Sequence, residues 1–259
     1  MSSSDPWKEV APSKDFPCKI PSADVLQHIH EVRDKAWDIR PYPCTGLGTF
    51  LQPTISKSPA YSTIISRLQS GDSFLDVGCY LSQDLKKLVF DGVSSDRLHG
   101  VDIVNHWDLG YEFFQDKKKF EARFIDTDIL NPNEELRALV GKIDIISVTH
   151  VLHQWDWKTQ IVAAKQLNAL SKSGTLVVGL QIGTSEGAKK IKEDDTQWEM
   201  QQDLESWAEM WKIVGEETGT KWKSDAQLKT FAELGFVTED TDYLTGKVRV
   251  LQFVITRNR

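Results

Sequence analysis

The sequence predicts an α/β fold with a doubly wound, mostly parallel sheet covered by helices on both faces. Short apolar segments alternate with helical segments through the middle of the chain, and this alternation is typical of a parallel sheet. One apolar segment leads through a tight turn at Gly78 directly into a helical pattern, as in the first half of a βαβ unit. A last apolar run at 248–255 follows Gly246 and Lys247, which predicts an antiparallel hairpin at one edge of the sheet.

The beginning of the chain predicts an arm and a helical cap. Its first part is rich in proline, serine and charge, which favours an extended segment. A helix is expected after Ser22, a suitable N-cap, and should end before Pro41, because the residue preceding a proline avoids the helical region. A short helix at 61–69 completes the cap. We therefore divide the chain into an arm and cap at 1–70 and a larger α/β domain at 71–259.

The larger domain contains five expected parallel strands with helices between them. The strands are placed at 73–77, 98–103, 121–125, 143–149 and 175–180. The helices are placed at 82–90, 107–114, 133–140 and 158–170. A final hairpin of 235–237 with 248–255 brings the sheet to seven strands. The segment at about 184–224 predicts a lid insertion, and it carries Trp198, Trp207, Trp211 and Trp222.

The composition favours a protein that handles a small molecule. Its net charge of −7 argues against a general nucleic-acid surface, and no apolar stretch approaches the ~20 residues of a membrane span. Cys18, Cys44 and Cys79 form no CxxC pair, which argues against a zinc site and for a reducing compartment. The polar start lacks the form of a signal peptide. We expect a cytoplasmic protein without a metal site, and leave open whether it forms a homodimer.

Carboxylates stand at the ends of the first three expected strands. Asp76 precedes the turn at Gly78, Asp102 lies 24 residues beyond that glycine (102 − 78), and Asp128 follows the third strand. In a doubly wound sheet the carboxyl ends of the strands meet where ligands bind, and an acid about 20 residues past the turn is spaced to meet ribose hydroxyls. The three acids together predict a nucleoside site, although each alone could be a helix cap or a solvated loop residue.

A nucleoside without a pyrophosphate suits this turn better than a dinucleotide, because the fingerprint G-x-G-x-x-G is absent. S-adenosylmethionine is such a ligand, and the backbone of 78–82 could hold its carboxylate. Asp102 would bind the ribose hydroxyls and Asp128 the adenine amino group, with the base between Ile103 and Ile129. The predicted cofactor-binding residues at the strand ends are Asp76, Gly78, Cys79, Asp102, Ile103, Thr127, Asp128 and Ile129.

The fourth expected strand ends in His150 and His153, with Trp155 close behind. Histidine changes protonation near neutral pH and can accept a proton from a hydroxyl. We expect His153 to orient or deprotonate an acceptor oxygen, with His150 as a second candidate. Either imidazole could instead hydrogen-bond the backbone. Likewise, Trp207 and Trp211, four residues apart on one helix face, could roof a bulky apolar substrate or pack in the core.

The segment Asp76-Val77-Gly78-Cys79 resembles motif I of class I S-adenosylmethionine-dependent methyltransferases, D-x-G-x-G-x-G. The region 33–222 resembles, more narrowly, fungal methyltransferases of meroterpenoid and polyketide pathways, several of which methylate a carboxyl group. Segments that carry this narrower resemblance are Pro41-Tyr42-Pro43-Cys44, Gln83-Asp84-Leu85, Gly141-Lys142-Ile143-Asp144, Leu152-His153, Asp156-Trp157, Glu205-Ser206, Met210-Trp211 and Thr218-Gly219-Thr220-Lys221-Trp222.

The chain departs from these patterns at five positions. Tyr80 and Ser82 stand where the motif has glycine, and Leu180, Gln201 and Gln202 stand where the fungal group tends to have basic residues. If the basic residues hold a substrate carboxylate, their loss leaves both a hydroxyl and a carboxyl acceptor open. It also keeps open a second hypothesis, a methyltransferase-fold isomerase or cyclase that transfers no methyl group, and a third, a non-catalytic partner subunit.

The resemblance implies a Rossmann-like class I methyltransferase fold with an N-terminal helical cap. It implies an O-methyltransferase that uses S-adenosylmethionine on a hydrophobic meroterpenoid or polyketide intermediate in fungal secondary metabolism. It adds Tyr42 to the expected cofactor contacts. The expected substrate contacts are Trp155, Gln181, Trp207, Trp211 and Arg40.

Overall fold

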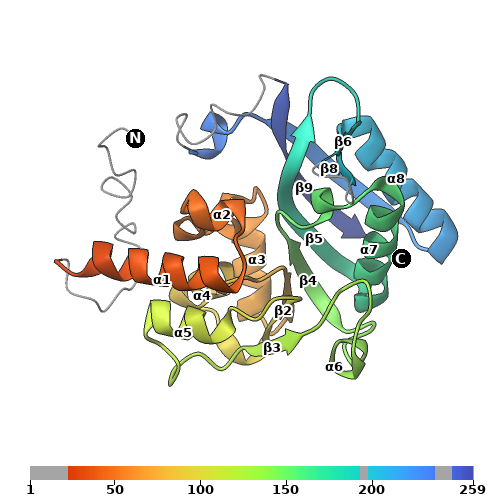
Figure 1. The fold of residues 1–259 in the computed structure, drawn as a ribbon. Helices are drawn as coiled ribbons and strands as arrows, with labels where there is room; N and C mark the ends of the chain where they lie inside the picture. The colour runs from red at the N-terminus through yellow and green to blue at the C-terminus, as the bar shows by residue number, and fades with distance from the viewer. Residues whose placement is uncertain (1–22, 193–197, 237–246, 259) are drawn as a thin grey trace.

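The protein is built around a seven-stranded mixed sheet with the strand order β3-β2-β1-β4-β5-β9-β8 (Figure 1). The computed structural model describes residues 23–192, 198–236 and 247–258. Strands β1 to β5 run parallel, and β9 is antiparallel to β5 and to β8. This confirms the predicted fold class. The strand bounds are β1 Phe74–Val77, β2 Leu98–Asp102, β3 Arg123–Asp126, β4 Ile143–Val148, β5 Ser171–Thr184, β8 Trp222–Lys229 and β9 Val248–Arg257.

Apolar side chains on both faces of β1 place it at the centre of the sheet. Leu75 and Val77 pack into one core, and Phe74 packs into a second core on the opposite face. The first face is covered by α7 (Trp157–Leu170) and α8 (Leu204–Thr218), and α6 (Glu134–Arg137) adds Leu136 to the same core (Figure 1). The second face is covered by α3 (Tyr61–Gln69), α4 (Gln83–Phe90) and α5 (Trp107–Phe114).

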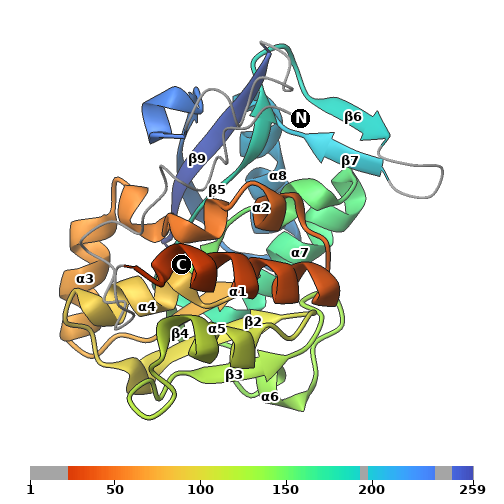
Figure 2. The ribbon, with the colours of Figure 1, turned by 60° about the vertical axis from the view of Figure 1, so that its left-hand side comes forward.

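The cap contains α1 (Val25–Ile39), the short α2 (Pro43–Gly46) and the segment that follows up to residue 57, and α1 lies between α2 and α5 (Figure 2). The apolar face of α1 is buried against α5 and contains Ile29, Val32 and Ala36. Asp24 occupies the N-cap position of α1. The arm and the expected N-cap Ser22 lie outside the described residues.

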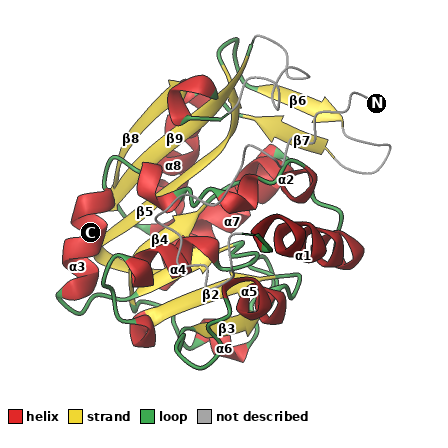
Figure 3. Cartoon of the chain, turned by 90° about the vertical axis from the view of Figure 1, so that its left-hand side faces the viewer, coloured by secondary structure: helices red, strands yellow, loops and turns green. Residues whose placement is uncertain are grey.

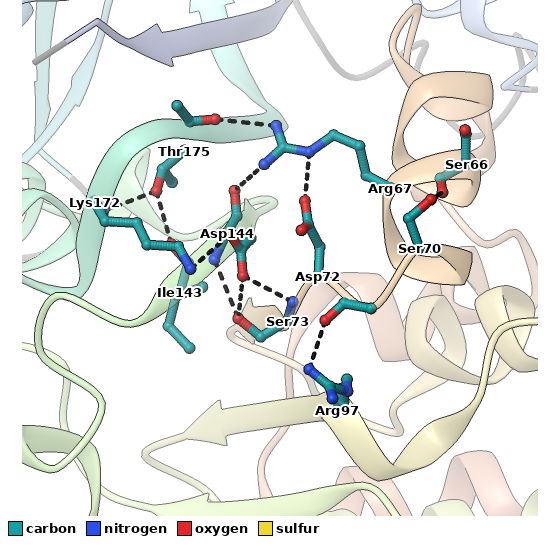
Figure 4. A network of polar contacts seen from close by, with 12 residues as sticks. Ser66, Arg67, Ser70, Asp72, Ser73, Arg97, Ile143, Asp144, Lys172 and Thr175 are labelled. Carbon is teal, nitrogen blue, oxygen red and sulfur yellow. Dashed lines mark hydrogen bonds and ion pairs between the residues drawn. The ribbon is translucent and has the colours of Figure 1, made fainter.

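A polar network closes the amino-terminal edge of the sheet, opposite the edge where β1 turns into α4 (Figure 4). Asp144 on β4 accepts hydrogen bonds from Ser73 N at 3.0 Å and Ser73 Oγ at 2.9 Å, and Lys172 Nζ lies 2.8 Å from its other oxygen. Thr175 Oγ1 donates to the Ile143 carbonyl at 2.7 Å. These bonds join β1, β4 and β5 at one end of the sheet and leave the other end for a ligand.

The prediction of the C-terminal hairpin is wrong for one of its two strands. The partner of β9 at the sheet edge is β8, Trp222–Lys229, whereas the expected strand at 235–237 begins with Gly235 in a left-handed turn. Val237 and Gly246 lie outside the described residues. β8 alternates little in burial and is largely polar, because an edge strand faces solvent. Its sequence therefore carries no clear strand signal.

The expected lid segment divides into two structurally different parts. A two-stranded hairpin of β6 (Lys189–Lys192) and β7 (Trp198–Gln201) stands apart from the main sheet (Figure 3). In contrast, α8 packs against α7 on the sheet, with Trp207 0 % exposed and Trp211 also buried in the core. α8 is thus a core helix, whereas β6 and β7 form a separate two-stranded sheet. Within the described ranges, no helix has the length and apolar character needed to cross a membrane.

Candidate cofactor and acceptor site

The turn after β1 holds three alternate residues in the left-handed conformation. Gly78 has φ +76°, and a Cβ at this position would collide with Val151 Cγ2. Tyr80 has φ +48° and Ser82 has φ +61°, although both carry side chains. Left-handed backbone costs a non-glycine residue about 1–2 kcal/mol. The turn therefore holds two residues with side chains in a backbone conformation that favours glycine, at the positions where the motif has glycine.

Contacts from the cap stabilise Tyr80 in this conformation. Its hydroxyl shares a buried hydrogen bond of 2.6 Å with Oγ1 of Thr45, which lies in α2. Its ring lies 4.6 Å from the ring of His106 and 6.1 Å from that of Tyr42, both in edge-on or near-perpendicular arrangements. The guanidinium of Arg40 lies 5.9 Å from the centre of the Tyr42 ring. The cap thus brings Tyr42 and Arg40, two of the predicted contacts, to the turn.

Cys79 points away from the turn. Its sulfur packs against Gly100, where a Cβ would lie 2.8 Å from both Cys79 Sγ and Trp107, and burial raises the pKa of the thiol. Only the backbone of Cys79 is therefore placed to contact a cofactor at this turn. Its backbone N–H already donates to the Val101 carbonyl at 3.3 Å.

Asp102, at the end of β2, lies against the same turn. Its Oδ2 accepts a hydrogen bond from Tyr80 N at 2.9 Å, and its Oδ1 accepts one from Val104 N at 3.0 Å. A carboxylate has about four acceptor directions, so two are left for hydroxyl groups of a ligand. Burial raises the pKa of Asp102, and the backbone hydrogen bonds oppose that rise. Ile103 beside it is 62 % exposed, which is unusual for isoleucine and leaves it open to a flat apolar ligand.

The end of β3 lies next to Asp102. Thr127 N donates to the Asp102 carbonyl at 3.1 Å, and Thr127 Oγ1 accepts from Asn133 N at 3.1 Å. Asp128 Oδ1 accepts from Leu130 N at 2.8 Å, while Ile129 is buried in the core. Among the described residues, the second carboxylate oxygen of Asp128 has no hydrogen-bond partner. The predicted set at the first three strand ends is thus brought together, with Thr127 shaping the turn.

Asp76 is buried within β1, directly before the turn. Ser147 of β4 is its neighbour across the sheet, and Asp84 of α4 and Asp102 lie close enough to interact with it electrostatically. Burial, together with these two acids, raises the pKa of Asp76 well above its usual value, and the Ser147 hydroxyl opposes the rise. Burial of this kind favours the protonated carboxyl group, whereas a hydrogen-bond donor or a cation beside it would favour the carboxylate.

His150 and His153 lie on the turn that follows β4. The backbone of His150 has φ +56° and is held by two hydrogen bonds of 2.7 Å. The backbone N–H donates to the Leu180 carbonyl, and the backbone carbonyl accepts from Gln154 Nε2. The two imidazole rings are perpendicular, with centres 5.9 Å apart. Burial lowers the pKa of His150 to about 4 and that of His153 to about 3, with His150 adding to the second shift. Both rings are neutral at pH 7 and able to accept a hydrogen bond.

The predicted substrate contacts are only partly grouped around this turn. Gln181 on β5 is 1 % exposed, and neither its amide nitrogen nor its amide oxygen has a hydrogen-bond partner in the described structure. Trp155 is half-buried, and its carbonyl accepts from Met200 N at 3.1 Å and from Gln160 Nε2 at 2.8 Å. These bonds connect β7 to the turn after β4 that carries His150 and His153, here called the histidine turn. Trp207 and Trp211 lie in the core instead.

Several residues of the site were not predicted from the sequence. Asp84 accepts hydrogen bonds from Thr54 Oγ1 at 2.7 Å and from Ile55 N at 3.0 Å, which attaches the cap to α4. Its place in the first turn of a helix is common for an acid, so no local signal marks it. Thr45 and Gln154 likewise contact residues that only the folded chain brings near.

Comparisons with known proteins agree with this geometry. Residues 17–51 match the family described as "Meroterpenoid methyltransferase N-terminal domain". The O-methyltransferase atr3 of Stereocaulon alpinum is 38% identical over 241 residues, which cover 86% of this chain and 69% of that protein. The Asnovolin E/Chermesin D methyltransferase nvfJ of Aspergillus novofumigatus is 38% identical over 207 residues, covering 78% and 74%.

A solved structure shows the same fold at low identity. The 1,6-didemethyltoxoflavin-N1-methyltransferase of Burkholderia thailandensis, solved with S-adenosylhomocysteine, superposes with a TM-score of 0.57 over 93% of both chains, at 13% identity.

Proposed function

This chain belongs to the family of fungal O-methyltransferases represented by atr3 and nvfJ, and from this premise we propose that it methylates an oxygen of a hydrophobic meroterpenoid or polyketide intermediate. S-adenosylmethionine supplies the electrophilic methyl group of this reaction. The observation that carries the proposal is the left-handed turn of Gly78, Tyr80 and Ser82 beside Asp102, because all three φ values are positive at the positions where the methyltransferase motif that this turn resembles has glycine.

The residues at the strand ends fit the cofactor by their free hydrogen-bonding capacity. Asp102 retains two acceptor directions for the ribose hydroxyls, and Asp128 retains one oxygen for the adenine amino group. The exposed Ile103 side chain would cover the base. The N–H groups of the turn at 78, 79, 80 and 82 already donate to protein acceptors, so the carboxylate of the methionine part would bind the Leu81 N–H and the N–H groups that open α4. Tyr42 closes this side from the cap.

The histidine turn would position the acceptor. Methyl transfer is a displacement in line, so alignment and exclusion of water contribute most of the rate. A neutral His153 would accept a hydrogen bond from an acceptor hydroxyl, with His150 as the neighbouring ring and Gln181 and Trp155 beside the turn. An acceptor carboxyl group is already ionised near neutral pH and would need orientation but no base.

The proposal also covers the setting of the reaction. We place the enzyme in the cytoplasm and its partner among small molecules, supported by the net charge of −7 and by the cysteine pattern. The molar mass of the purified protein in solution distinguishes a monomer from a homodimer, which the sequence leaves open.

The test is turnover with methyl-labelled S-adenosylmethionine on candidate terpenoid and polyketide intermediates. We expect the label in an O-methyl group of the product and S-adenosylhomocysteine as the second product. Conversion of a substrate by the native protein without transfer of label would overturn the proposed reaction and favour an isomerase or cyclase.

A further inference from the structure

The side chain of Tyr80 joins the turn after β1 to the cap. Its ring is 7 % exposed and belongs to the same apolar core as Phe50 of the cap and Phe113 of α5. The centres of the Tyr80 and Phe50 rings lie 6.3 Å apart in an edge-on arrangement, and the Tyr80 hydroxyl shares its 2.6 Å hydrogen bond with Thr45 of α2. The motif that this turn resembles has glycine at this position, and a glycine could make none of these contacts.

The backbone of Tyr80 fixes two groups of the predicted cofactor site. Its N–H donates to Asp102 Oδ2 at 2.9 Å, and its left-handed conformation sets the direction of the chain into Leu81. The Leu81 N–H donates to none of the described residues. Because a peptide unit is planar, rotation about the Cα–C bond of Tyr80 would turn the Leu81 N–H with it. The orientation of this free donor therefore depends on the residue whose side chain the cap holds.

Opposing contributions act on the conformation of Tyr80. Left-handed backbone is unfavourable for a residue with a side chain, whereas the hydrogen bond with Thr45 and the ring contacts with Tyr42 and His106 favour it. The backbone cost and the gain from one hydrogen bond are of the same order. The helix α2 has four residues and is too short to be stable alone. The turn and α2 therefore stabilise each other.

We propose that Tyr80 is a positioning residue that couples the docking of α2 to cofactor binding, an inference that rests on the proposed function. Docking of α2 on the Tyr80 hydroxyl holds the turn in the conformation that presents the Leu81 N–H to S-adenosylmethionine or S-adenosylhomocysteine. It also holds Tyr42, the N-cap residue of α2, beside the turn. Coupling between two equilibria is reciprocal, so the bound cofactor should hold α2 in place by the same factor.

The first experiment is titration calorimetry of the full chain with S-adenosylhomocysteine, comparing the native protein with Tyr80→Phe. This variant loses the bond to Thr45 and keeps the ring. We expect the dissociation constant to rise about fivefold, the effect of one buried hydrogen bond. Tyr111→Phe is the matched control, because the Tyr111 hydroxyl donates to the Phe120 carbonyl at 3.5 Å in a different core. It should leave the dissociation constant unchanged.

The variant Thr45→Val removes the other partner of the same bond and should weaken binding by a similar factor. If the bond between the two hydroxyls carries the coupling, the double variant of Tyr80→Phe and Thr45→Val should bind no more weakly than either single variant. Effects that multiply in the double variant would show that the two residues act separately, and the inference would then be wrong.

Hydrogen exchange of the α2 amides separates a positioning role from a purely structural one. The N–H of Thr45 donates to the Tyr42 carbonyl and that of Leu47 to the Pro43 carbonyl, both at 2.9 Å, so their exchange reports whether α2 is formed. Added S-adenosylhomocysteine should slow their exchange about fivefold in the native protein and less than about twofold in Tyr80→Phe. A residue that only stabilised the fold would leave this response to the ligand unchanged.

The remaining outcomes separate the inference from the proposed function. A dissociation constant of Tyr80→Phe within about twofold of the native value would overturn the inference and leave the cofactor site in place. Tighter binding by Tyr80→Gly would also overturn it, because the tyrosine would then only obstruct a position that suits glycine. Failure of the native protein to bind both cofactor forms would instead overturn the proposed function. Melting temperatures of the variants without ligand identify any loss of folding.

Discussion

Gly78 is the residue at which backbone conformation and close packing both restrict the side chain. Its φ of +76° disfavours any other residue, and a Cβ would collide with Val151 Cγ2 on the histidine turn. We expect Gly78→Ala to lower the free energy of unfolding by about 1–2 kcal/mol for the backbone and by about 1–3 kcal/mol more for the collision. The measurement is urea denaturation.

Gly141→Ala is the matched control for that substitution. Gly141 has φ +70°, but a Cβ there would meet no atom within 4 Å. It should therefore lose only the backbone contribution of about 1–2 kcal/mol. Equal losses in the two variants would show that close packing against Val151 contributes nothing.

Asp102 has a structural role in addition to its proposed role toward the ribose. It accepts hydrogen bonds from Tyr80 N and Val104 N, so Asp102→Ala leaves two backbone donors without their acceptor. We expect weaker S-adenosylhomocysteine binding, by at least ~1.5 kcal/mol, and a free energy of unfolding lower by about 1–3 kcal/mol. Calorimetry and urea denaturation measure the two effects. Asp126→Ala, an exposed acid at the end of the neighbouring strand, should change neither by more than about 0.5 kcal/mol.

At the scale of elements, the ion pair of Asp144 and Lys172 at the amino-terminal edge of the sheet leads to a prediction about how stability depends on pH. The Lys172 ammonium and the Ser73 donors outweigh burial and lower the pKa of Asp144 below its usual value. A carboxyl group with a lowered folded pKa stabilises the protein above its unfolded pKa of about 4, and this contribution is lost as the pH falls through the folded value.

The variant Asp144→Asn tests that contribution. At pH 7 we expect it to unfold with a free energy lower by about 1–3 kcal/mol, because the charged acceptor of Ser73 is lost. The difference from the native protein should shrink as the pH is lowered from 6 toward 3. A difference that stays constant over this range would assign the effect to shape and not to charge.

How far the elements could be predicted depended on where each lies in the sheet. Strands β1, β2, β4 and the later part of β5 are largely buried, so their apolar runs are visible in the sequence, whereas β3 at the other edge of the sheet buries only Ile125. All five strands were placed correctly apart from their ends. β8 faces solvent at the edge and shows no such run. Trp207 and Trp211 were ambiguous, because the same aromatic stripe suits a lid and a core helix.

The site could be predicted where its residues follow strands. Asp76, Asp102 and Asp128 were found because parallel strands end at one edge. Asp84 was not, because its partners Thr54 and Ile55 belong to the cap and meet it only through tertiary packing. The left-handed conformation of Tyr80 was also not predicted, because a tyrosine at this position gives no sign of it.

At the scale of the whole molecule, three parts of the chain converge on the carboxyl edge of the sheet. The cap contacts the turn after β1 through Thr45 and Tyr80, and β7 contacts the histidine turn through Met200 and Trp155. The sheet itself supplies the acids and His150. The cofactor and acceptor sides are thus assembled from separate segments, so a variant on one side should leave the other side intact.

His153 tests this separation between the two sides. In His153→Ala we expect S-adenosylhomocysteine affinity within twofold of the native value, because the ring belongs to the acceptor side. Turnover of a hydroxyl substrate should fall about 10²-fold, the lower end of the range for general base catalysis, because burial makes this imidazole a weak base with a pKa of about 3.

Since His150 and His153 are protonated only below about pH 4, native turnover should be level between pH 5 and 8. Turnover with labelled S-adenosylmethionine measures these effects, and His153→Gln, which keeps a hydrogen-bond acceptor, should recover part of the loss. If His153→Ala lowers cofactor affinity as much as turnover, or if the native rate follows a group with a pKa near 6.5, His153 does not act as a neutral acceptor-side residue.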